Sequence, residues 1–97
     1  MASSKSAPIH LPEILDSSAA SALREVLLAQ RGEALVIHAD GVERISTPCL
    51  QVLMSAAATW LADGVGFAIS GPSAMVVETV ALLGISREQL PMEQTTT

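Results

Sequence analysis

Ser46, Thr47, Pro48 and Cys49 offer more chemistry than any other short segment of this chain, because two hydroxyls, a proline and a thiol stand side by side. The segment follows an apolar, strand-like run and leads into a long helical pattern. Loops in that position often carry catalytic or binding residues in α/β domains. The residue types allow three interpretations: a phosphorylation site on Ser46 or Thr47, a redox site on Cys49, or a docking surface.

The redox interpretation depends on Cys49, the only cysteine of the chain. A thiol near a helix N-terminus has its thiolate stabilised by the helix dipole, which raises its reactivity. No second cysteine can resolve an oxidised Cys49, and Arg44 is the only cation nearby in sequence. We therefore interpret Cys49 as a small, semi-buried residue at a helix start, and keep a thiol redox protein as an alternative of a different class.

Other catalytic chemistry has little support. His10 and His38 are far apart in the sequence and lack the clustered partners that a metal ion needs. No glycine-rich phosphate-binding motif is present. The acidic residues nearest the predicted elements read as caps or turns: Asp16, Asp40, Glu43 and Asp63. We expect a protein that is not an enzyme and that binds neither a metal nor a cofactor.

The composition limits the size of the fold and the classes of partner that the chain can bind. The 97 residues suffice for one small domain but not for two, and Trp60 and Phe67 are the only Trp, Tyr or Phe residues, so the core must be aliphatic. The net charge of −5 argues against binding nucleic acid or an anionic membrane surface. No apolar run resembles a signal peptide or a membrane span. We expect a cytoplasmic protein with no membrane insertion.

The elements that must position the loop alternate between strand and helix patterns. Strands are expected at 9–11, 14–15, 35–37 and 66–70, helices at 19–30, 48–62 and 74–83, and one further turn at 87–90. Gly32, Gly64 and Gly84 are expected to end the three helices. This pattern predicts one α/β domain over 8–91, with flexible tails at 1–7 and 92–97. Short connections favour a mixed or parallel sheet of about four strands, packed with about four helices.

The helix expected at 48–62 carries no charged residue. Its core stripe is expected to be Leu50, Leu53, Met54, Ala57 and Leu61. Its outer face would then hold Gln51, Ser55 and Thr59, with Val52 and Ala56 beside them. A solvated helix face normally carries Lys and Glu, so we expect this face to meet a partner protein, a tail of the chain or a second copy. Trp60 is expected in the core, with an interface anchor as the alternative.

Several segments carry a resemblance to a known family. Leu15-Asp16 precedes the first helix, Leu35 to Val42 form an apolar strand and turn, and Leu83-Gly84-Ile85 close the pattern. Residues 67–73 match a final strand followed by a Gly-x-Ser helix start. Residues 45–50 fall on a loop that usually reads apolar-Asp-Ser-Ser/Ala-Gly-Leu. In this order, over about residues 9–85, the sequence resembles a STAS domain, the sulfate-transporter and anti-anti-sigma module.

The departures from the family loop bear on phosphorylation. In anti-anti-sigma relatives a kinase phosphorylates the second hydroxyl residue of the loop, and Pro48 occupies that position here. Ser46 replaces the loop aspartate, Cys49 its glycine, and His38 an aspartate common at the end of the central strand. Ser46 and Thr47 remain as candidate acceptors outside the usual position. The resemblance therefore implies a docking surface without the usual phosphorylation switch.

Residues 47–53, followed by Ala56 to Trp60, resemble a narrower group, the small STAS proteins encoded with chemotaxis genes (the CheS type). That resemblance implies an adaptor that binds a CheA-type histidine kinase and indirectly helps phosphate drain from a CheY-type response regulator. The expected binding residues are Ser46, Thr47, Pro48, Cys49, Gln51, Val52, Ser55, Ala56 and Thr59. The alternatives are an anti-anti-sigma-like antagonist in a partner-switching pathway and the STAS subunit of an ABC-type lipid transporter. The latter would normally keep an Asp-Thr-Ala-Gly-like loop.

Overall fold

The computed structural model describes residues 9–93. Its elements in chain order are β1 (Ile9–His10), β2 (Ile14–Leu15), the 3-10 helix η1 (Ser17–Ala19), α1 (Ala20–Leu28), β3 (Leu35–His38), β4 (Arg44–Ile45), α2 (Thr47–Asp63), β5 (Phe67–Ser70), α3 (Ala74–Leu82) and β6 (Met92–Glu93). The α/β fold class is confirmed. The predicted tail at 1–7 lies outside the described residues, as do residues 94–97.

Four parallel strands form the main sheet in the order β1-β3-β5-β6. β2 and β4 make a separate parallel pair, because the chain bends at Pro12 between β1 and β2.

The prediction of a tail from residue 92 is wrong for the first two positions. Met92 and Glu93 pair with Ile69 and Ser70 of β5, so these two residues form the last strand of the sheet.

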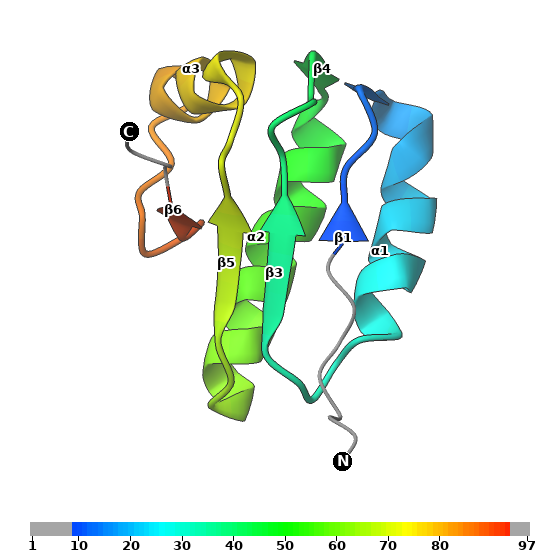
Figure 1. The fold of residues 1–97 in the computed structure, drawn as a ribbon, viewed down its shortest axis with the longest axis vertical. Helices are drawn as coiled ribbons and strands as arrows, with labels where there is room; N and C mark the ends of the chain where they lie inside the picture. The colour runs from blue at the N-terminus through cyan, green and yellow to red at the C-terminus, as the bar shows by residue number, and fades with distance from the viewer. Residues whose placement is uncertain (1–8, 94–97) are drawn as a thin grey trace.

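In Figure 1, α2 lies behind the sheet and α1 stands to the right of β1, packed against α2, whereas α3 lies beyond the carboxyl end of β5. The core between sheet and helices is aliphatic, as the composition predicts. Ile37 and Ile69 of the two central strands are fully buried, and Leu50 and Leu53 of α2 are 1% exposed. Among residues 9–93, Val36 on the opposite face of β3 remains 42% exposed.

Gly64 ends α2 as predicted, whereas Gly32 lies beyond the end of the helix that it was expected to stop. Gly32 follows α1 with φ 99°, and Gly64 caps α2 in the left-handed region with φ 75°. The Gly64 amide donates to the carbonyl oxygen of Leu61 at 3.1 Å, which completes the last turn of α2. Gly64 therefore acts as a stop because other residues rarely adopt a positive φ, but α1 already ends at Leu28, with Ala29 as its C-cap.

Two expected core residues are exposed. Leu61 is 78% exposed because the buried face of α2 is centred near Leu53 and includes Trp60; at 3.6 residues per turn, Leu61 lies roughly 80° from that centre. On α3 the sequence pattern predicts a buried stripe of Val76, Val77, Val80 and Leu83. Val76 and Val80 are buried, but Leu83, the C-cap of α3, is 51% exposed. The predicted turn at 87–90 is present, with the Leu90 amide bonded to the Ser86 carbonyl at 3.0 Å.

Candidate docking site

The loop before α2 is held in place from both sides. Ser46 is the N-cap of α2, and its hydroxyl oxygen accepts a hydrogen bond from the Cys49 amide at 3.4 Å. The Ser46 amide donates to the carbonyl of Leu15 at 2.8 Å, which fixes the loop to β2. Pro48 lies in the first helical turn, as predicted, where its missing N–H leaves no intrahelical bond unmade. The sequence Ser-Thr-Pro-Cys thus gives a rigid helix start.

Within this loop, the structure separates the exposed residues from the buried one. Thr47 and Pro48 are exposed and Ser46 is half-buried, whereas Cys49 is fully buried. The Cys49 thiol donates to the carbonyl oxygen of Asp16 at 3.3 Å, below the loop. Cys49 therefore positions the loop from inside and does not present its side chain to a partner.

Burial of the Cys49 thiol gives a testable expectation. In the native protein its reaction with a water-soluble disulfide reagent should be about 100-fold slower than in denaturant, because the thiol must first be exposed by local opening. Absorbance of the released thiolate measures both rates. A native rate close to the rate in denaturant would contradict this burial and favour the redox alternative.

A groove of about 520 Å³ lies between α1 and α2. Its lining from α2 comprises Pro48, Gln51, Val52, Ser55, Ala56, Thr59 and Trp60. Its lining from α1 comprises Ala20, Arg24, Leu27 and Leu28. Gln51 and Ser55 are exposed along it, whereas Ala56, Leu27 and Trp60 are buried at its base. We call this surface the α1–α2 groove.

Six of the nine residues expected to bind a partner line the α1–α2 groove: Pro48, Gln51, Val52, Ser55, Ala56 and Thr59. Ser46, Thr47 and Cys49 stand at the start of α2 and do not line it. Sequence reasoning missed the α1 wall. The signal in the sequence was Leu28: α1 buries Leu23 and Leu27, whereas Leu28 is a large apolar residue that remains 44% exposed.

Among residues 9–93, Arg24 is the only charged residue that lines the α1–α2 groove. Its side chain is exposed, and within residues 9–93 it forms no ion pair or hydrogen bond. The α2 wall contributes amide, hydroxyl and apolar groups only. The groove therefore combines neutral walls with a single positive charge.

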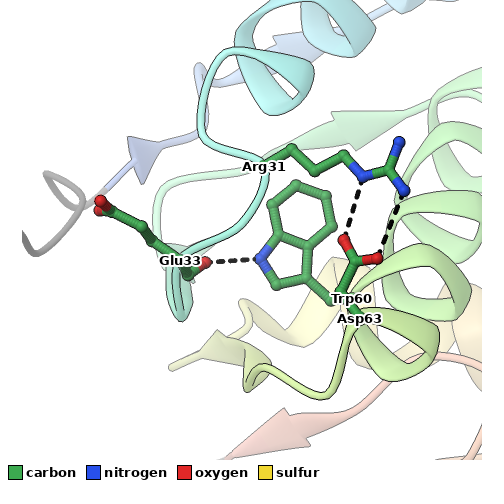
Figure 2. A network of polar contacts seen from close by, with 4 residues as sticks. All are labelled: Arg31, Glu33, Trp60 and Asp63. Carbon is green, nitrogen blue, oxygen red and sulfur yellow. Dashed lines mark hydrogen bonds and ion pairs between the residues drawn. The ribbon is translucent and has the colours of Figure 1, made fainter.

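The base of the groove is fixed at its far end by Trp60. The indole N–H of Trp60 donates to the backbone carbonyl of Glu33 at 2.7 Å (Figure 2). The Trp60 and Phe67 rings also meet at a centroid distance of 5.7 Å. Trp60 is therefore a core residue, as expected, and it joins α2 to the connection between α1 and β3.

Close to Trp60, Arg31 and Asp63 form an ion pair with an N–O distance of 3.0 Å (Figure 2). The hydrogen bond from Arg31 lowers the pKa of the Asp63 carboxyl. Any stability from this pair is present above the ordinary carboxyl pKa and is lost as the pH falls through the lowered value. Because both side chains are solvent-exposed, the pair contributes little.

Other chemistry-bearing groups are sparse. His10 and His38, distant in sequence, stack at paired positions of β1 and β3 with ring centroids 4.6 Å apart and an interplanar angle of 15°. Within residues 9–93, no group of three or more His, Cys, Asp or Glu side chains could hold a metal ion. In the same residues, no helix is long and apolar enough to cross a bilayer.

A parallel sheet, a capped loop before α2 and a groove between α1 and α2 with the charged residue Arg24 in its lining define a small α/β domain suited to binding. More specifically, the chain belongs to the STAS family: the family model described as "Mlab, STAS domain" matches residues 2–92. STAS domains are generally non-enzymatic binding and regulatory domains. No curated protein and no solved structure matches the chain.

Proposed function

We propose that this STAS domain is an adaptor in bacterial signalling that binds a CheA-type histidine kinase through the α2 wall of the α1–α2 groove and the adjoining loop. The observation that carries the proposal is the absence of charge on the exposed part of α2. Gln51 and Ser55 are exposed in the middle of a helix that has no Lys, Arg or Glu and has Asp only at its last position, Asp63. The narrower choice of partner comes from the resemblance of residues 47–60 to the chemotaxis group.

The proposed mechanism requires only that binding of the adaptor to the kinase be coupled to binding of the response regulator. An adaptor that raises the affinity of the kinase for its CheY-type regulator by 5- to 150-fold changes the coupling free energy by about 1–3 kcal/mol. Phosphate would then return from regulator to kinase more often, and the signal would end sooner. No group on this chain has to take part in the chemistry.

A second candidate is the STAS subunit of an ABC-type lipid transporter, which the match to the "Mlab, STAS domain" family favours. The loop argues the other way, because Ser46-Thr47-Pro48-Cys49 replaces the Asp-Thr-Ala-Gly-like sequence expected there. Both candidates require a protein partner on the same face of α2, and they differ in which ATP-using protein is bound.

Co-purification separates the two candidates. The tagged full chain should retain the CheA-type kinase of the same organism in a stable 1:1 complex, and should shorten the lifetime of the phosphorylated CheY-type regulator when kinase is present. The ABC-type ATPase from that organism is the comparison. Retention of the ATPase instead of the kinase would replace the first proposal with the second.

A further inference from the structure

We infer that the α1–α2 groove receives a three-turn amphipathic helix of the partner, whose apolar ridge fills the groove and whose carboxylate pairs with Arg24. This inference rests on the proposed function, because it specifies the chemistry of the partner at the same site. It extends the binding surface from α2 to α1, and it requires a negative charge on the partner, which the uncharged face of α2 alone does not require.

The length of the groove sets the size of the occupant. Its α2 wall extends from Pro48 to Thr59, which at 1.5 Å per residue is roughly 16 Å, or three turns. α1 packs beside α2, so the hollow between them runs along two helices. A third helix can lay its ridge into such a hollow by ordinary side-chain packing. An extended strand gains less, because helices offer no unpaired backbone for a ladder.

The lining suits an apolar ridge. Ala20 and Ala56 are small and allow close approach, Leu27 is buried beneath, and Leu28 and Val52 flank the hollow as exposed or half-buried apolar side chains. The exposed Gln51 and Ser55 can donate to or accept from polar groups at the edge of a bound helix. Leucine-like residues spaced three and four apart fit this arrangement.

The charge of the occupant follows from Arg24. Covering an unpaired guanidinium with an apolar helix would remove its water without replacement, which is costly. A carboxylate on the bound helix restores hydrogen bonds and charge balance.

Synthetic peptides test the inference with the full chain. The probes are fluorescein-labelled 15-residue helical peptides with leucines at positions 1, 4, 8 and 11 and a single Glu in the first, middle or last turn; matched peptides carry Gln or Lys instead. At least one Glu peptide should bind saturably and raise the fluorescence polarisation. Backbone NMR shifts of the chain should change at groove residues and not at the open face of β3.

Arg24→Gln should weaken binding of that Glu peptide by about 3- to 10-fold and leave the Gln peptide unaffected. Arg87→Gln, at an exposed position in the turn before β6, is the matched control and should bind as the unaltered chain. Arg24→Glu should shift the preference toward the Lys peptide. Failure of every peptide to bind, shifts outside the groove, or equal binding of Glu and Lys peptides would overturn the inference.

The outcome is independent of the partner's identity. If the peptide binds but the kinase is not retained, the helix-binding groove is supported and the kinase is rejected as the partner. If the kinase is retained but no peptide binds and Arg24 has no effect, the adaptor function is supported and the proposal of a carboxylate-bearing helix in the groove is rejected.

Discussion

Replacing Trp60 with alanine should lower the free energy of unfolding by about 3–5 kcal/mol, the usual cost of deleting a large buried aromatic side chain. Trp60 is 1% exposed, packs on Phe67 and supports the base of the α1–α2 groove. Native domains have roughly 5–15 kcal/mol of stability, so this single change should leave the chain close to unfolded at 37 °C. Urea denaturation followed by far-ultraviolet circular dichroism measures the change, since Trp60 is the only tryptophan and its fluorescence is lost in the variant.

Trp60→Phe separates packing from the hydrogen bond. Phenylalanine retains part of the ring packing but cannot donate to the Glu33 carbonyl, so a smaller loss of about 1–3 kcal/mol is expected. Leu61→Ala, one position along α2 and 78% exposed, should change stability by no more than about 0.5 kcal/mol. Equal losses for Trp60→Ala and Leu61→Ala would contradict the assignment of the core face of α2.

Much of the fold could be predicted because its signals are local. Gly64 stops α2 through its own backbone freedom, and Pro48 fits the first turn of α2 for a reason confined to its ring. The apolar run Leu35-Val36-Ile37 predicts a central strand that is covered on both faces. β3 does lie between β1 and β5, but Val36 is 42% exposed, so only one face of the strand is covered. These features depend on neighbouring residues, which the sequence displays directly.

The features that were missed depend on distant contacts. Met92-Glu93 has no strand signal of its own and is ordered by the free edge of β5. The exposure of Leu61 depends on how α2 is rotated on the sheet, which Trp60 and its bond to Glu33 help to set. The α1 wall of the groove, with Arg24 as its one charge, arises only when α1 packs beside α2. Of the candidate site, the sequence therefore predicted one wall.

Ser55→Glu should weaken binding of the signalling partner by about 10- to 100-fold, equivalent to roughly 1.4–2.7 kcal/mol. Ser55 is exposed near the middle of the α2 wall, so a bound partner would desolvate the new carboxylate without pairing it. Gln51→Glu, one turn earlier on the same wall, should act in the same direction. Isothermal titration of the full chain with the purified partner gives the affinities.

The matched control is Leu61→Glu, which adds the same charge to the same helix on the side away from the α1–α2 groove. It should leave affinity unchanged, because Leu61 lies roughly 120° around the helix from Ser55 at 3.6 residues per turn. Circular dichroism melting should be similar for all three variants, since each substitution is at an exposed site. If Ser55→Glu and Gln51→Glu bind as tightly as Leu61→Glu, α2 docks through another face and the groove is not the interface. If only the two groove variants lose affinity, the uncharged wall is the part of this STAS domain that the partner contacts.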